Sequence, residues 1–142
     1  MDEKINLGDL EYDKGNQLSD EEMNKLDGCR VKIASVEVIN DTSRYKDGQL
    51  LPDEQEVEVK KIELLSELFG TDLIGREVTH RERYNLKNAD GVWKVSLHEK
   101  SNTGQFLAKY GIDKFENAVG KEVVLVKKTN PDSKRSWMRI SI

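Results

Sequence analysis

Residues 101–128 contain a short helical segment that ends at a glycine and is followed closely by a β-branched strand. Phe106, Leu107 and Tyr110 recur at helical spacing, and hydroxyl and amide side chains just before them are suitable N-caps. Gly111 supplies the left-handed conformation that commonly ends a helix. The sequence therefore predicts a helix late in a chain that otherwise carries strand patterns.

The chain after this helix predicts one more turn and a terminal hairpin. Asp113 and Glu116 have the spacing of a capping box, and Gly120 closes the turn. The segment 121–128 has a β-branched centre with charged ends, which is typical of a mostly buried strand. After a turn-forming cluster, residues 135–142 alternate as a last strand.

Two earlier segments alternate but change parity midway. In residues 30–39 the apolar positions move to the other parity near Ala34, which predicts a β-bulge. Residues 56–65 show the same change after Lys61, although a short helix reaching Phe69 fits that pattern as well. Two long strands that each change face are what a small, strongly coiled barrel needs, so we expect a closed sheet.

A hairpin is predicted between these strands and the helix. Residues 76–87 alternate, and their Asn-Ala-Asp-Gly continuation at 88–91 suits a tight turn with positive φ. Residues 92–98 then return, and we assign Trp93 to the core because it shares parity with apolar neighbours. The predicted buried face of the first strand comprises Val78, His80, Tyr84 and Leu86.

The amino-terminal part of the chain differs in charge from the rest. Residues 1–28 carry nine acidic and three basic side chains, whereas the whole chain has a net charge of −4. Ser19 and Glu22 predict a capping box that starts a short helix. We therefore divide the chain into an acidic segment with a short helix at 1–28 and one folded domain at 29–142.

Composition narrows the function classes. One cysteine and two histidines are too few for a usual zinc site, and the sequence contains no phosphate-binding glycine loop or nucleophile motif. We therefore expect no metal, no cofactor and no enzymatic activity. The absence of a long apolar run and of a basic amino-terminal leader predicts a cytoplasmic protein with no membrane segment.

The predicted order of elements is that of an OB-fold, in which a helix lies between the third and fourth strands of a small barrel. Residues 84–87, the Trp93 strand, 106–112 and 119–123 carry a resemblance to small OB-type domains of phage and archaeal proteins. Some of those are grouped with single-stranded-DNA-binding proteins. The expected fold class is all-β with short helices, as an OB-fold-like β-barrel of five to six strands.

An OB barrel that binds single strands uses aromatic faces for stacking and basic side chains for phosphates. Trp137 and Arg139 share the parity opposite to the apolar residues of the last strand, so we expect both on the outside. The long polar loop at 40–55 adds another aromatic residue between two cations. The candidate nucleic-acid-binding residues are Arg44, Tyr45, Lys46, Arg81, Arg83, Lys87, Trp137 and Arg139.

Two functions are compatible with these patterns. The first is a non-catalytic domain that binds single-stranded nucleic acid through these residues. The alternative is a protein-interaction or assembly module, of phage type or uncharacterised, that uses the same barrel face. In either case the acidic residues of 1–28 are placed to cap one end of the barrel or to lie over the binding groove and mimic nucleic acid.

Overall fold

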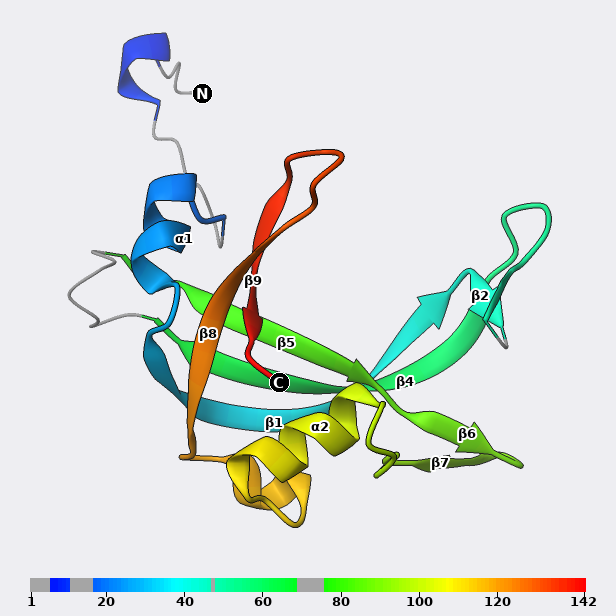
Figure 1. Ribbon diagram of the computed structural model, residues 1–142. Helices are drawn as coiled ribbons and strands as arrows, with labels where there is room; N and C mark the ends of the chain where they lie inside the picture. Colours follow the sequence, from blue (N-terminus) through cyan, green and yellow to red (C-terminus); the bar gives the residue numbers. More distant parts are fainter. Residues whose placement is uncertain (1–5, 11–16, 47, 69–75) are drawn as a thin grey trace, which may run out of the picture.

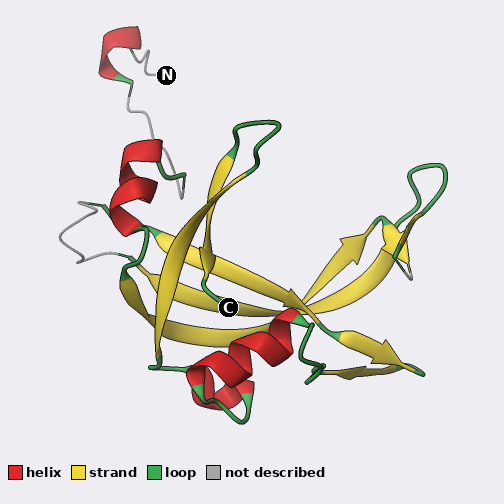
Figure 2. Ribbon diagram, in the orientation of Figure 1, coloured by secondary structure: helices red, strands yellow, loops and turns green. Residues whose placement is uncertain are grey.

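The computed structural model describes residues 6–10, 17–46, 48–68 and 76–142, and it is mainly β with two short α-helices (Figures 1 and 2). The helical elements are the 3-10 helix η1 (Leu7–Asp9), α1 (Asp20–Leu26), α2 (Asn102–Tyr110) and the 3-10 helix η2 (Phe115–Ala118). The strands are β1 (Arg30–Ser43), β2 (Tyr45–Lys46), β3 (Gln49–Leu50), β4 (Val57–Glu67), β5 (Thr79–Asn85), β6 (Lys87–Ala89), β7 (Val92–Lys94), β8 (Glu122–Thr129) and β9 (Ser136–Ile140).

Five long strands form one antiparallel sheet in the order β5-β4-β1-β8-β9. Strand β1 connects the two parts of the sheet, because its first three residues pair with β8 and the rest of its length pairs with β4. The sheet consequently bends, and the β8–β9 hairpin rises across the face made by β1, β4 and β5 (Figure 1). The predicted terminal hairpin is confirmed.

The bulge predicted near Ala34 is confirmed, since the pairing of β1 with β4 shifts register between Ile33 and Ser35. The second predicted bulge is wrong. Strand β4 runs without a shift through its pairing with β5 and through its pairing with β1 from Val57 to Leu65. The alternative helix through Phe69 is wrong as far as Glu67, which ends β4; Phe69 itself lies outside the described residues.

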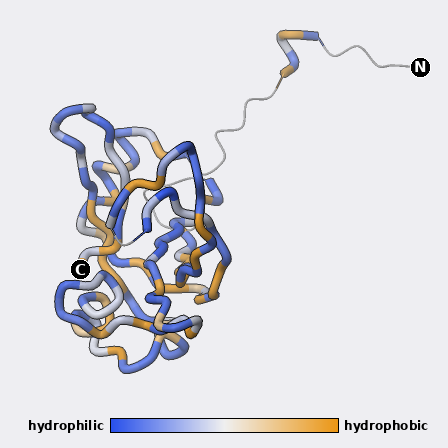
Figure 3. The backbone as a smooth tube through the Cα atoms, turned by 90° about the vertical axis from the view of Figure 1, so that its right-hand side faces the viewer, coloured by the Kyte–Doolittle hydropathy of each residue, from blue (hydrophilic) through white to orange (hydrophobic). Residues whose placement is uncertain are grey.

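The core fills the space enclosed by the bent sheet, α1 and α2. Buried residues alternate with more exposed ones along β5, β8 and β9, and the tube in Figure 3 changes repeatedly between hydrophobic and hydrophilic colours. Leu26 of α1 and Phe106 of α2 are fully buried in it, and the Phe106 ring is stacked on Phe115 with centroids 5.5 Å apart. The short acidic helix thus shares its core with the sheet.

The predicted helix ends are largely confirmed. Ser19 and Glu22 form the capping box of α1, and the Ser101 side chain accepts a hydrogen bond from Gly104 at the start of α2. Gly111 follows α2 in the left-handed conformation, with φ of 63°. The capping box predicted at Asp113 is wrong, because η2 begins after Lys114, which makes no side-chain cap.

Two small hairpins project from one end of the sheet (Figure 1). The loop predicted at 40–55 is shorter than expected because β1 continues to Ser43, and the next residues form the β2–β3 hairpin. The β6–β7 hairpin continues from β5 and turns at Asp90 and Gly91, as predicted. These hairpins form separate two-stranded sheets.

The edge strands β5 and β9 approach each other but share no main-chain ladder in the described residues, so the sheet is not closed in the way that the sequence predicted. Their contact is made by Glu82, whose buried carboxylate accepts a hydrogen bond from the main-chain N–H of Ile140. Among the described residues, no helix has the length and apolar character that crossing a membrane requires.

Candidate nucleic-acid interface

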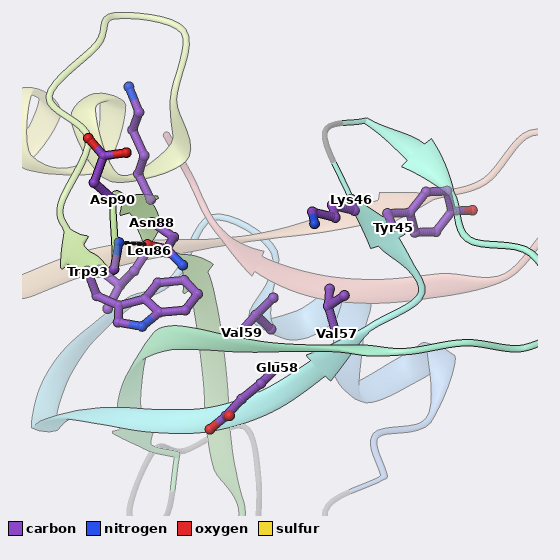
Figure 4. A pocket seen from close by; sticks show the side chains of 11 residues that line it. Tyr45, Lys46, Val57, Glu58, Val59, Leu86, Asn88, Asp90 and Trp93 are labelled. Atoms are coloured by element: carbon purple, nitrogen blue, oxygen red, sulfur yellow. Dashed lines mark hydrogen bonds between the residues drawn. The ribbon is translucent and has the colours of Figure 1, made fainter.

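A groove of about 670 Å³ lies between the two projecting hairpins (Figure 4). We call it the Trp93 groove. This volume is in the range of roughly 300–1,000 Å³ that is typical of ligand sites. The residues that line it are Tyr45, Lys46, Val57, Glu58, Val59, Leu86, Lys87, Asn88, Asp90, Gly91 and Trp93.

The β6–β7 turn places Trp93 in this groove. Asp90 and Gly91 have φ of 52° and 83°, the positive values of a tight two-residue turn, and the side-chain oxygen of Asn88 accepts a hydrogen bond from the N–H of Gly91. Trp93 is the cross-strand partner of Asn88. Its half-buried indole lies at the inner side of the hairpin, facing the groove (Figure 4).

The β2–β3 hairpin supplies the opposite wall. Tyr45 pairs with Leu50 and Lys46 pairs with Gln49, and the hairpin base is closed by a hydrogen bond from the N–H of Leu51 to the carbonyl of Arg44. Neighbouring residues of a strand point to opposite sides. Lys46 accordingly extends toward the side of Trp93, whereas the Tyr45 ring points away to the outer side of the hairpin (Figure 4).

The floor of the groove explains the parity change of β4. Val57 and Val59 point into the space between Lys46 and Trp93, and Glu58 points to the other side of the strand (Figure 4). Further along, Ile62 and Leu64 occupy the opposite parity and are buried in the core. One strand without a register shift therefore turns odd-numbered valines to the groove and even-numbered apolar residues to the core, and no bulge is needed.

The two lysines of the groove are not neutralised by ion pairs with described carboxylates. In the described part of the chain, neither Lys46 nor Lys87 has a carboxylate within ion-pair distance. The acidic lining residues are Glu58, which is directed away from the floor, and Asp90, which lies beyond the Trp93 ring at the hairpin tip (Figure 4). The centre of the groove thus combines an indole, an ammonium group and an apolar floor.

The predicted arginines of β5 and β9 are engaged in ion pairs. Glu63 is 5% exposed and pairs with both Arg81, at 3.4 Å, and Arg83, at 2.8 Å. Glu82 is equally buried and pairs with Arg139 at 3.3 Å. Buried carboxylates therefore offset the basic row that the sequence places on this face.

The eight predicted residues do not form one site. Tyr45, Lys46 and Lys87 line the Trp93 groove, and Arg44 lies exposed at the base of the same hairpin. Trp137 and Arg81 line a second groove between β5 and β9, whereas Arg83 and Arg139 line neither groove. Trp137 is on the outer face as predicted, with 42% of its surface exposed.

The sequence pattern does not identify two residues that matter to these sites. Trp93 was assigned to the core, but it belongs to neither the buried core nor the residues packed against it. Glu82 has the parity of Val78 and Tyr84 and was left out of the buried face. Strict alternation along 78–86 would have indicated that Glu82 is buried. The short hairpin around the Asp-Gly turn would have indicated that Trp93 lies outside the core.

No known family model matches the chain, and comparison with curated proteins and with solved structures gives no match. Among the described residues, no group of three or more histidine, cysteine, aspartate or glutamate side chains is placed to hold a metal ion. Function is therefore inferred from the geometry of the two grooves.

Proposed function

We propose that this protein is a non-catalytic OB-like domain that binds single-stranded nucleic acid in the Trp93 groove. The observation that carries the proposal is the convergence of Trp93 and Lys46 from two separate hairpins over the floor made by Val57 and Val59 (Figure 4). A stacking surface beside a cation is the recurring arrangement of single-strand binding sites.

The strand order supports the OB-like part of the proposal. Strands β1, β4, β5, β8 and β9 take the places of five barrel strands, and α2 follows the third of them and precedes the fourth. The side-chain bridge from Glu82 to Ile140 joins the two free edges where a barrel closes. The groove then lies beside the start of the second strand and just past the end of the third, next to the face that OB-folds use for oligonucleotides.

The chemistry of the groove suits a base and its phosphates. An aromatic face stabilises a stacked base by roughly 1–3 kcal/mol, without selecting its identity. We expect the valine floor to exclude water beneath the base, and Lys46 and Lys87, which both line the groove, to neutralise about two phosphates. We therefore expect weak to moderate affinity, little sequence preference and a shallow dependence on salt.

The test is a titration with oligothymidylate, followed by tryptophan emission at several salt concentrations. Two phosphate contacts predict a slope of log affinity against log salt of about −1.4. The Lys46→Gln variant is expected to reduce this slope by about 0.7. Lys100→Gln, at an exposed position outside both grooves, is the matched control and should leave the slope unchanged. No binding at low salt, or affinity indifferent to salt, would refute the proposal.

A further inference from the structure

The second groove, which we call the Trp137 groove, lies where β5 and β9 separate beyond the contact of Glu82 with Ile140. It has a volume of about 570 Å³ and is bordered by α1 on its third side. The residues that line it come from α1, from the first halves of β5 and β9, and from the segments that precede each of these three elements. They are Gln17, Leu18, Met23, Leu68, Val78, Thr79, His80, Arg81, Arg135, Ser136, Trp137 and Met138.

The bottom of this groove is apolar and its rim carries an exposed aromatic ring. Met23, Val78 and Met138 are buried side chains of the core that also line the groove, so an entering apolar group meets the core directly. Trp137 keeps 42% of its surface exposed at the rim. Such a depression favours a partner with at least one apolar anchor.

The strand edges in this groove present main-chain groups that the sheet does not use. Because the N–H of Ile140 points to Glu82, regular alternation directs the main-chain N–H and C=O of Met138 away from β8 and toward the groove. Just after β5, the N–H of Leu86 donates to the carbonyl of Lys60, so the main-chain groups of the even-numbered residues of β5 point toward β4. The main-chain N–H and C=O of Arg81, an odd-numbered residue, consequently point away from β4 and toward the groove. An open edge of this kind is a template for an added strand.

The positive charge of the groove indicates which kind of partner it can bind. Its described lining contains two arginines and a histidine but no aspartate or glutamate. Arg135 is exposed and makes no ion pair with any described residue, and Arg81 is half exposed although Glu63 lies 3.4 Å away. The groove is therefore complementary to carboxylates.

We propose that the Trp137 groove binds an extended acidic segment of a protein partner. The segment pairs its main chain with the open edge of β9, inserts an apolar side chain against Met138 and Val78, and places carboxylates near Arg81 and Arg135. The open main-chain edge favours a peptide over nucleic acid, because phosphates and bases do not reproduce the alternating donors and acceptors of a strand.

The test uses a fluorescein-labelled peptide of sequence Asp-Glu-Leu-Asp-Leu-Glu and the full-length protein, with fluorescence anisotropy as the readout. The acidic peptide is expected to bind, and its counterpart with lysine at each acidic position is not. Arg135→Glu should weaken binding by up to about fivefold, as expected for an exposed charge pair. Lys100→Glu, the same charge change outside the groove, should have no effect.

Two further measurements separate the alternatives. A peptide with N-methyl groups on both leucines cannot donate main-chain hydrogen bonds from them, and should lose most of its binding. Trp93→Ala should leave peptide affinity unchanged, which distinguishes this site from the Trp93 groove. Equal binding of the lysine peptide or of the methylated peptide would overturn the proposal, and displacement of the acidic peptide by oligothymidylate would assign the groove to nucleic acid instead.

Discussion

The carboxylate of Glu82 on β5 accepts a hydrogen bond of 2.5 Å from the main-chain N–H of Ile140 on β9. The same buried carboxylate contacts the guanidinium of Arg139 at 3.3 Å and the Nε2 atom of His80 at 3.0 Å. One side chain therefore joins two strands that share no main-chain ladder in the described residues. It also lies at the border between the Trp137 groove and the remaining contact of β5 with β9.

Replacing Glu82 is expected to destabilise the fold strongly. Glu82→Ala leaves the N–H of Ile140 and the Arg139 guanidinium without their acceptor, which costs about 1–3 kcal/mol of unfolding free energy. Glu82→Gln keeps one acceptor oxygen and should cost less. Urea unfolding measures both, and Glu77→Ala, an exposed glutamate of the same region, is the control and should stay within about 0.5 kcal/mol. A similarly small loss for Glu82→Ala would show that the bridge contributes little.

Tyr84 in the core and Tyr110, which packs against it, should respond oppositely to removal of their hydroxyl groups. The hydroxyl of Tyr84 is buried without a hydrogen-bond partner in the described structure, and burial raises the pKa of this phenol far above its usual value. The hydroxyl of Tyr110 donates to the carbonyl of Ser141 at 2.7 Å and accepts from the N–H of Val124 at 3.2 Å.

Tyr84→Phe is therefore expected to be neutral or stabilising by up to about 1 kcal/mol, because a buried polar group without a partner is removed. Tyr110→Phe should destabilise by about 1–2 kcal/mol, because it leaves two main-chain groups unpaired. Thermal and urea unfolding of the pair give the comparison. Equal losses for both variants would contradict the assignment of these hydroxyl groups.

Helix α2 approaches the preceding turn closely at Gly104. A Cβ atom at this position would lie 2.2 Å from the main-chain oxygen of His98 and 2.9 Å from the carbonyl carbon of Leu97. Gly104→Ala should therefore destabilise by about 1–3 kcal/mol, the typical cost of overpacking, although alanine favours helix by about 1 kcal/mol.

The matched control is Ala108→Gly at an exposed position of the same helix, which should cost about 1 kcal/mol from propensity alone. Circular dichroism during urea unfolding measures both variants. An increase in stability for Gly104→Ala would show that α2 is not held against the main chain of residues 97–98.

The contact between Glu22 of α1 and Arg76 should weaken at acidic pH. A hydrogen bond from Arg76, together with the main-chain N–H of Ser19, lowers the pKa of Glu22 from 4.5 to about 2. The folded state thus favours the ionised carboxylate, and its contribution to stability is complete above about pH 4.5 and is lost as the pH falls toward 2. Glu22→Gln should reduce stability at neutral pH.

The difference in urea midpoint between wild type and Glu22→Gln is expected to stay constant above pH 5 and to disappear near pH 2, because the pKa of Glu22 is about 2 in the folded protein. A difference that persists unchanged at pH 2 would show that the Glu22 carboxylate is not held by Arg76 in the folded protein.

Local patterns predicted much of the fold because they depend on nearby residues. The Ser19 capping box, the Gly111 helix end, the Asp90 turn and the bulge near Ala34 are each set by a few side chains and their backbone preferences. The strand order and the near approach of β5 to β9 depend on contacts between distant segments, and no local pattern specifies them.

The candidate site was predicted less well for the same reason. The parity change in β4 is real, but its cause is not a bulge. The strand begins with Val57 and Val59 at the Trp93 groove and continues, without a register shift, into the core at Ile62. The outward position of Arg83 was predicted correctly, whereas its pairing with buried Glu63 required knowledge of the neighbouring strand. Trp93 was misassigned because alternation does not distinguish a core face from a groove face.

In the proposed function Trp93, and not Trp137, stacks on a single-stranded base. The most direct measurement is the affinity of oligothymidylate for Trp93→Ala and Trp137→Ala, by anisotropy of a labelled oligonucleotide at one low salt concentration. The predicted result is a loss of about 5- to 150-fold for Trp93→Ala, corresponding to one stacked base, and no change for Trp137→Ala. Unchanged affinity for Trp93→Ala, or a loss confined to Trp137→Ala, would contradict the account.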